Sequence, residues 1–443
     1  MAMINKFSTP SIRGQADLFS LPATDTTVES SFYAEYKPIV NIQDSDAKIE
    51  FRIVGNSSQY LDLYDHFCYV RVKVINNDGT DLPAGAPIST ANLFMHSLFS
   101  NCDVGINNQL VSSSNNCYMY KAFLETILTY GRDYMNSQGT CPLFFCDTDA
   151  GKLTTANTGF ETRKQYIAES KPVEMIDKLK FDLSNQQRYI LNDTTVNIAL
   201  TRSPETFSIL YDGKPFTAAA SGSVPVTFQP KIKFMDASLF VRKHVLYPSI
   251  VLSHQRLLDS GHNARYPFRK SEVKFFSIPQ SSQSFVEENV FLSNVPSRII
   301  VCLVPSASFI GDYKLNPYVF PHNDLSYISL SVNNVPTPIK GVNLNFTTNE
   351  YLLPYYLLFS ALGIAGQDQG LTFDRKKFAE QYAFFAFDIS HNTSDSTLHL
   401  EKSGSVRLEL KFQKGLTEAL NCLIYSEQQK VLEIDKFRQM SIQ

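Results

Sequence analysis

The chain has 443 residues, more than one hydrophobic core usually serves, so two domains are expected. Its composition is 43% hydrophobic and 19% charged, with 33 Phe and 22 Tyr, which excludes a disordered chain and provides ample material for packed cores. The formal net charge of -3 excludes a strong overall attraction to nucleic acid or to an anionic membrane, so any contact with DNA is expected to be local or weak.

The cysteines and the apolar segments indicate where the protein is made. The cysteines are odd in number and scattered, so we expect reduced thiols that pack in the core rather than a disulfide framework. Residues 1–12 are polar and lack a secretion signal, and no segment approaches the roughly 20 apolar residues of a membrane span. We therefore expect a cytosolic or nuclear product that is not secreted through the ER. The seven cysteines are Cys68, Cys102, Cys117, Cys141, Cys146, Cys302 and Cys422.

Alternation of apolar and polar residues is the main signal in the first half of the chain. Residues 48–53 and 68–74 alternate with a period of two, which predicts strands with one buried and one wet face. Polar turns such as Asn77-Asp78-Gly79 separate the strands. A helix is predicted from Asn116, as N-cap, to Gly131, because apolar residues recur there at helical spacing.

The second half repeats these signals after a linker expected near residues 257–266. The apolar run at residues 299–304 predicts a strand that is buried on both faces. A second helix is predicted over residues 351–362, with Pro354 near its first turn. Residues 406–412 alternate again, as expected for a half-buried strand.

The two halves share landmarks in the same order, which indicates an internal duplication. A polar pair precedes each helix, and matching strand patterns follow it. The differing spacings predict that the first half carries loop insertions near residues 139–168 and 204–230. The matched pairs are Asn107-Asn108 with Asn333-Asn334, residues 181–184 with 387–390, residues 196–200 with 406–410, and residues 239–241 with 423–425.

Many short strands in a duplicated chain predict an all-β fold of two tandem eight-stranded jelly-roll β-sandwiches, a double jelly roll, with a short helix in each. The expected organisation is an N-terminal arm over residues 1–27, a first jelly roll over 28–258 and a second over 259–443.

No motif for nucleotide binding, nucleophile-elbow hydrolysis or zincin chemistry is present, and we expect no catalytic, cofactor-binding or metal site. Cys141 and Cys146 with His66 or His96 form a conceivable metal cluster, but their spacing lacks a second ligand pair and favours packing. Residues 147–149 begin like a calcium loop and lack its remaining ligands.

Three other groups of polar residues invite a functional reading. His254, Asp259 and His262 could suggest acid-base or metal chemistry, but they fall around the expected linker and favour a solvated or interfacial role. The basic clusters at residues 242–244 and 375–377 could face DNA, although without interleaved aromatic residues a solvated turn or strand edge is the simpler reading.

The stretch from Val173 to Ser184 and on through residues 198–202, together with the tandem landmarks, resembles the double jelly-roll major capsid proteins of Polintons (Mavericks) and adintoviruses. These proteins are related to adenovirus hexon and virophage capsid proteins, and the resemblance spans nearly the whole chain. It implies a non-enzymatic structural protein of a dsDNA virus, forming homotrimeric, pseudo-hexagonal capsomers that tile an icosahedral shell.

The resemblance further implies trimer-trimer lattice contacts, penton and minor capsid proteins as partners, only weak or indirect contact with packaged dsDNA, and a place in the virion after assembly in the host nucleus or cytoplasm. An alternative is a non-catalytic jelly-roll binding module, such as a penton, fibre or lectin-like virion component, which needs about half this length. A third reading, a cupin-type or glycan-processing enzyme, would need inward-pointing metal ligands or a carboxylate pair that the sequence does not show.

Overall fold

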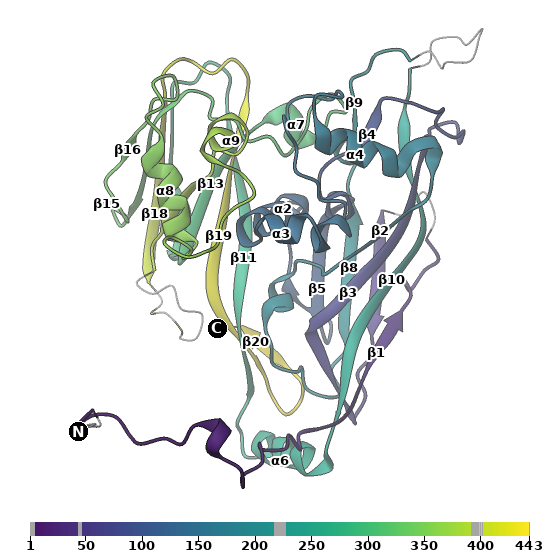
Figure 1. Ribbon diagram of the computed structural model, residues 1–443, viewed down its shortest axis with the longest axis vertical. Coiled ribbons are helices and arrows are strands. Elements are labelled where there is room, and N and C mark those ends of the chain that lie inside the picture. Colours follow the sequence, from purple (N-terminus) through teal and green to yellow (C-terminus); the bar gives the residue numbers. More distant parts are fainter. Residues whose placement is uncertain are drawn as a thin grey trace.

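The computed structural model describes residues 5–42, 47–216, 227–390, 398, 400 and 402–442, and folds into two β-sandwiches that lie side by side (Figure 1). All strand pairs within the four main sheets are antiparallel. The four sheets are named below by their lowest-numbered strand.

The first sandwich packs the β1 sheet on the β2 sheet. The β1 sheet has the order β1 (Val28–Tyr36), β10 (Pro230–Leu246), β3 (Gln59–Asn76) and β7 (Val173–Asp177). The β2 sheet has the order β2 (Lys48–Ile53), β8 (Val196–Arg202), β5 (Phe99–Ile106) and β6 (Gln109–Ser112). A small separate sheet joins β4 (Ile88–Thr90) to β9 (Ile209–Tyr211).

The second sandwich packs the β11 sheet on the β12 sheet. The β11 sheet has the order β11 (Ala264–Ile278), β19 (Leu420–Ile434), β13 (Arg298–Pro305) and β17 (Phe385–Asp388), with β20 (Met440–Ile442) beside β19. The β12 sheet has the order β12 (Ser284–Asn294), β18 (Ser403–Phe412), β14 (Leu325–Val332) and β15 (Val335–Pro336), with β16 (Val342–Asn343) beside β14.

The strand order is the same in both sandwiches. When the eight main strands of each sandwich are counted along the chain, one sheet has the order first, eighth, third, sixth, and the other has the order second, seventh, fourth, fifth. This is the jelly-roll order, so the prediction of two tandem eight-stranded jelly rolls is confirmed.

The register between equivalent strands repeats as well. Ile106 pairs with Val196 in the first sandwich, and Val332 pairs with Val406 in the second. The next two residues after Ile106 and after Val332 form the hairpin turn, and in each turn both asparagines have φ between 48° and 67°. Asparagine tolerates this left-handed backbone better than most residues, which explains why the pair recurs at Asn107-Asn108 and Asn333-Asn334.

One proposed landmark pair is wrong in register. Residues 387–388 lie inside β17, whereas residues 182–185 form a short 3-10 helix beyond the end of β7. The two segments share a sequence pattern but occupy different places relative to equivalent strands. The pairs in β8 with β18 and in β10 with β19 do fall in equivalent strands.

Both predicted helices are present, as α2 (Tyr118–Thr129) and α8 (Leu352–Ala361). The predicted cap of the first helix is wrong, because the N-cap is Cys117 and no side chain caps the helix. Two further helices were missed, α4 (Thr158–Ile167) inside an expected loop insertion and α6 (Pro248–Asp259), which ends in the first residues of the expected linker. The short helices are α1 (Phe94–Ser97), α3 (Arg132–Met135), α5 (Glu205–Ser208), α7 (Ser306–Ile310) and α9 (Arg375–Glu380).

The two third strands of the jelly rolls differ in burial. In β3, buried residues alternate with half-exposed ones along residues 67–74, because one face meets the core and the other lies at the surface. In β13, residues 299–304 are all buried, as the apolar run predicts. The outer face of the β11 sheet is therefore covered, and the cover is α2 of the first sandwich (Figure 1).

The described part of the N-terminal arm, residues 5–27, runs along the base of the molecule past α6 and away from the sandwiches (Figure 1). Its large apolar side chains are almost fully exposed, including Phe7 at 92%, Phe19 at 98% and Leu21 at 93%.

The left-handed turn at Asn334 provides a test of the hairpin register. Because its φ is 64°, the β-branched substitution Asn334→Val should cost about 1–2 kcal/mol of folding free energy, measured from thermal or denaturant unfolding. Asn334→Gly, which favours the same backbone conformation, is the control and should cause no loss. Equal destabilisation by both substitutions would contradict the assigned turn.

Candidate functional site

The described residues bring no catalytic constellation together, and the most elaborate site in the molecule is the seam between the two sandwiches. Helix α2 follows the fifth strand of the first jelly roll and lies between the sandwiches (Figure 1). Phe123 of α2 stacks on Tyr318 of the second sandwich with ring centroids 4.1 Å apart, and Tyr120 stacks on Phe309 at 5.5 Å. These rings are large and mostly buried, so they contribute strongly to holding the two sandwiches together.

A buried ion pair lies beside this aromatic cluster. Lys121 Nζ of α2 is 2.5 Å from Asp182 Oδ1, and both side chains are almost completely buried. Asp182 also accepts hydrogen bonds from the backbone N–H of Ser271 on β11 and from the hydroxyl of Ser112. Burial by itself would lower the pKa of Lys121, but the charges of Asp182 and Glu125 together with the hydrogen bond to Asp182 outweigh it. The pKa of Lys121 is therefore raised, which favours its charged form.

A charged cavity of about 230 Å³ lies between α2 and the outer face of the β11 sheet. Glu427 at its wall is 3.2 Å from Arg298 and 3.5 Å from Arg269. Glu125 of α2 lines the same cavity, and burial raises the pKa of its carboxyl. Glu427 and the two arginines belong to neighbouring strands of the β11 sheet, so their ion pairs fit a structural role within this sheet better than a ligand site.

Hydrogen bonds close the seam at both ends. At one end, Arg438 donates to the backbone carbonyl and the side-chain oxygen of Asn192, and Asn107 donates to the carbonyl of Arg438. At the other end, Lys377 and Gln381 donate to the backbone carbonyls of residues 147 and 148. The seam therefore joins segments that lie more than two hundred residues apart in the chain.

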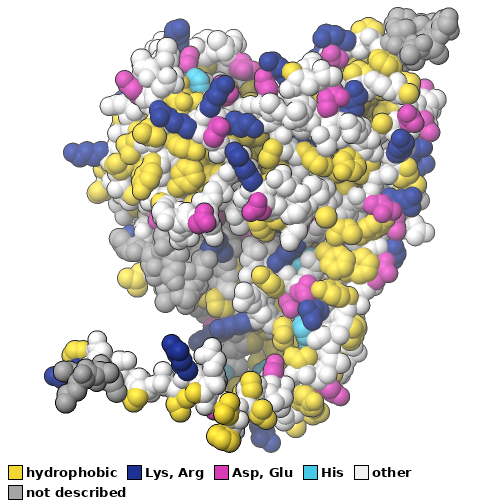
Figure 2. Space-filling model, in the orientation of Figure 1, with side chains coloured by type: hydrophobic (Ala, Val, Ile, Leu, Met, Phe, Trp, Pro, Cys, Tyr) yellow, Lys and Arg dark blue, Asp and Glu magenta, His cyan; other side chains and the backbone are white. Residues whose placement is uncertain are grey.

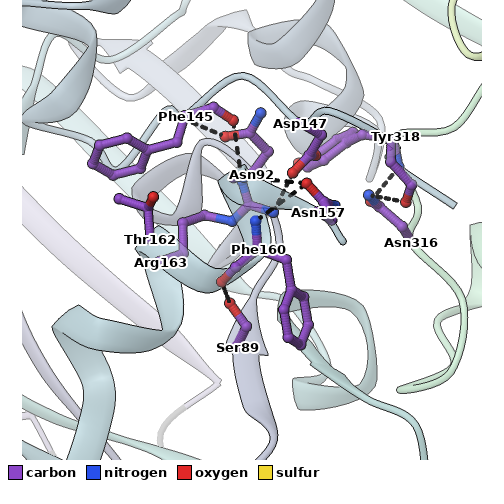
Figure 3. Close-up of polar contacts among 12 residues, drawn as sticks. Ser89, Asn92, Phe145, Asp147, Asn157, Phe160, Thr162, Arg163, Asn316 and Tyr318 are labelled. Carbon is purple, nitrogen blue, oxygen red and sulfur yellow. Dashed lines mark hydrogen bonds and ion pairs between the residues drawn. The ribbon is translucent and has the colours of Figure 1, made fainter. Parts of the chain in front are cut away.

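The loop at residues 145–150, which carries these contacts, is held by a second buried ion pair (Figure 3). Arg163 of α4 is 2.9 Å from Asp147 and donates to the backbone carbonyls of Thr90 and Phe145. Neither charged side chain is more than 1% exposed. The first position of the conceivable calcium loop is therefore occupied in an ion pair with an arginine, as Figure 3 shows, and Asn157 caps the N-terminus of α4.

The conceivable metal cluster does not come together. His96 is hydrogen-bonded to Tyr118 and Asp177, and His66 to the backbone of Leu63 and Leu179. Cys141 and Cys146 are exposed, and the other five cysteines are buried. Among the described residues, no group of three or more His, Cys, Asp or Glu side chains is placed to hold a metal ion.

The residues near the expected linker are also accounted for by local contacts. His254 lies 3.1 Å from the hydroxyl of Tyr60, Asp259 accepts from Gln255, and His262 contacts Ser260. His254 and His262 line a mainly apolar cavity of about 470 Å³ beneath α6. The cavity brings together no carboxylate partner for either histidine among its described lining residues.

The two basic clusters are engaged within the molecule. Arg242 pairs with Asp65, Lys243 donates to Gln59, and His244 stacks on Tyr189. In the other cluster Arg375 donates to the carbonyl of Asn349, and Lys376 pairs with Glu380. These contacts fit charged residues at a solvated turn or strand edge better than a row of basic residues that binds DNA.

Two exposed apolar surfaces were missed by the sequence reasoning. The first is on α8, where Leu352, Leu353 and Tyr356 are 53%, 46% and 59% exposed, and Figure 2 shows hydrophobic side chains gathered over this helix. The second is the outer face of the β1 sheet, where Tyr33, Phe67 and Phe240 form an aromatic row. The signal for the first surface was available, because the α8 sequence LLPYYLLF is apolar on all sides.

Comparisons with known proteins place the chain among double jelly rolls. No family model matches it. An uncharacterized protein of Caenorhabditis elegans is 24% identical over 434 residues, covering 94% of this chain and 98% of that protein. A chain of the Sputnik virophage structure covers 100% of this chain and 94% of its own length, with a TM-score of 0.65 and 12% identity.

Two further solved structures share the fold. The Faustovirus major capsid protein matches 94% of this chain and 93% of its own, with a TM-score of 0.57 and 8% identity. The mavirus major capsid protein matches 100% and 96%, with a TM-score of 0.50 and 10% identity. These similarities establish a common fold along the whole chain, and no helix of the described residues is long and apolar enough to span a membrane.

The seam ion pair provides a test of how the sandwiches are joined. Lys121→Met leaves Asp182 buried without its cation, so the free energy of unfolding should fall by about 3–5 kcal/mol, measured by denaturant unfolding. The exposed Lys152→Met, which removes a surface ion pair with Asp149, is the control and should change it by less than about 1 kcal/mol. Similar effects of the two substitutions would contradict a structural role for the buried pair.

The buried histidine His66 provides a pH test. Burial lowers the pKa of His66 to about 3, from an ordinary value near 6.5, so the unfolded chain binds a proton between these values that the folded protein does not. The free energy of unfolding therefore decreases as the pH falls from about 6.5 towards 3. This histidine contributes up to about 1.4 kcal/mol per pH unit to the decrease.

His66→Gln should reduce this pH dependence, measured as the slope of unfolding free energy between pH 6 and pH 4. Measurement at pH 8, where the histidine is neutral in both states, separates the loss of packing and hydrogen bonds from the proton-linked effect. An unchanged slope in the variant would show that His66 is not buried in its neutral form.

Proposed function

We propose that the protein is a structural capsid protein, a major capsid protein of the kind found in Polinton-like and virophage-like dsDNA viruses. The observation that carries the proposal is the repetition of one jelly roll, with the same strand order and register, in a single chain. Full-length likeness to the mavirus and Faustovirus major capsid proteins supports it. The chain then acts as a building block and not as an enzyme.

The duplicated fold supports a trimeric capsomer by geometry. Three copies of a chain with two similar sandwiches place six sandwiches around one axis, which gives a pseudo-hexagonal block that can tile the facets of an icosahedral shell. In such a ring each first sandwich meets a second sandwich of the next copy, which is a heterologous contact that closes after three steps. The seam within the chain supplies the other three contacts of the ring.

The same proposal assigns the parts of the chain. Residues 28–258 and 259–443 form the two jelly-roll units, and residues 1–27 form an arm whose exposed apolar side chains suit contacts made on assembly. Partners are further trimers in the shell lattice, with penton and minor capsid proteins, and packaged dsDNA only weakly. The protein would be located in the virion, after assembly in the host nucleus or cytoplasm.

A penton, fibre or lectin-like binding module uses one sandwich, so the second sandwich and the extensive seam favour the capsid building block. Arg242, Arg375 and their neighbours pair within the chain, which supports an indirect relation to DNA.

Mass measurement and electron microscopy of the purified chain test this function. We expect particles with the mass of three 50.0 kDa chains and a six-cornered outline, and assembly of these into sheets or shells at high concentration. A chain that stays a 50.0 kDa monomer at all concentrations tested would overturn the proposal.

A further inference from the structure

The two long connecting helices occupy equivalent places in the chain but different environments. Helix α2 follows the fifth strand of the first jelly roll and α8 follows the fifth strand of the second. The apolar side chains of α2 are buried, because β5 of the first sandwich covers one side of the helix, and β11 with the segment that carries Phe309 and Tyr318 covers the side towards the second sandwich. Helix α8 packs on its own sandwich through Pro354 and Leu358, and its outer side remains exposed.

The exposed side of α8 is one continuous apolar surface. Leu352, Leu353 and Tyr356 fall on the same side of the helix, at positions i, i+1 and i+4, and each is about half exposed. A helix that is apolar all round is usually buried in a folded assembly. Figure 2 shows the hydrophobic side chains of this region gathered on the face of the molecule that carries α8.

The β1 sheet presents a matching surface. Phe240 and Phe67 are paired across β10 and β3 and stack with centroids 4.7 Å apart. Tyr33 on β1 extends the row, 5.5 Å from Phe67, and is 47% exposed. Ile176 on β7, 43% exposed, continues the apolar surface across the sheet beside Tyr69.

The seam within the chain shows which surfaces of this fold meet. There, α2 of the first jelly roll packs on the outer face of the β11 sheet of the second jelly roll. The two exposed surfaces are the equivalents of these elements with the jelly rolls exchanged. They are α8 of the second jelly roll and the outer face of the β1 sheet of the first. A single chain cannot bring them together, because they lie on opposite ends of the pair of sandwiches (Figure 1).

We infer that the exposed face of α8 in one copy of the chain packs on the aromatic face of the β1 sheet in the next copy, through Leu352, Leu353 and Tyr356 against Tyr33, Phe67 and Phe240. This inference rests on the proposed function and names the surfaces of its contact between copies. Each copy provides one helix and one sheet face, so the contact is head-to-tail, and in the proposed trimer it closes after three copies. The ring buries both apolar surfaces at once.

Site-directed cross-linking of two chains tests the contact. One chain carries Tyr356→Cys and the other Tyr33→Cys, both in a Cys141→Ser, Cys146→Ser background that removes the exposed thiols and leaves the five buried ones. The two chains are co-assembled and treated with a bismaleimide. We expect covalent dimers in the mixture and none from either chain alone, because the contact joins different surfaces.

The control mixture replaces Tyr356→Cys by Leu292→Cys. Leu292 is 65% exposed on β12. The equivalent strand of the first jelly roll, β2, has an exposed outer face and, among the described residues, takes no part in the seam within the chain, so β12 lies outside the inferred contact. This mixture should give no dimer. Dimers from the Tyr356→Cys chain alone would overturn the inference in favour of a symmetric helix-helix contact.

Charge substitution gives an independent measurement. Leu353→Glu places a carboxylate in the inferred contact and should raise the midpoint concentration of trimer assembly at least about tenfold, measured by sedimentation. Leu292→Glu is the matched control and should leave the midpoint unchanged. Thermal unfolding of both variants at low concentration shows whether each chain still folds.

The outcomes separate this inference from the proposed function. Trimers by mass that neither cross-link between positions 33 and 356 nor weaken with Leu353→Glu would overturn the assigned surfaces and leave the capsid building block standing. A chain that remains monomeric would overturn both.

Discussion

The docking of α2 between the two sandwiches is the interaction on which the rest of the structure depends. Phe123 and Tyr120 insert their rings against the second sandwich, and the Lys121–Asp182 pair is closed by a backbone N–H from β11. An apolar contact that encloses a buried, hydrogen-bonded ion pair has few alternative arrangements. These contacts therefore favour one arrangement of the two jelly rolls, which the proposed role as a tile in a regular shell requires.

Charged residues in the core serve this rigidity. Arg163 with Asp147 holds the loop that receives hydrogen bonds from Lys377 and Gln381. A buried pair of this type adds little net stability over an apolar pair of the same volume, but it strongly penalises any arrangement that separates the two charges. The buried charges thus favour one geometry of the seam over others, and this is the property that the seam requires.

The duplication links the interior of the chain to its exterior. Because both jelly rolls have the same strand order, the surface that meets a neighbour inside the chain recurs on its outside, as α8 and the outer face of the β1 sheet. The burial of β13 and the alternation of β3 express the same difference, since one sheet already has its cover and the other presents an aromatic face at the surface. In the inferred trimer, equivalent elements of the repeated fold make both the contact within the chain and the contact between copies.

Local patterns in the sequence were sufficient for the class of fold, because a period of two and polar turns are properties of neighbouring residues. They predicted the alternating strands and the doubly buried strand at residues 299–304, and they matched the two asparagine pairs that form equivalent turns in the two jelly rolls. They failed at α4 and α6, where short amphipathic helices with many polar residues read as loop and linker. They also matched residues 181–184 to 387–390, since a four-residue pattern carries no information on strand register.

The sequence by itself determined that the chain is a β-rich duplicated protein with no recognised catalytic motif, and that each half holds one apolar helix. Only the tertiary structure decided which polar residues pair and which apolar faces remain exposed to solvent. Asp147 looked like part of a cation loop until Arg163 was seen beside it, and Tyr33 and Phe240 share a face although they lie far apart in the chain. Such contacts depend on how the strands pair and how the sandwiches dock, and these long-range arrangements leave no trace in the spacing of neighbouring residues.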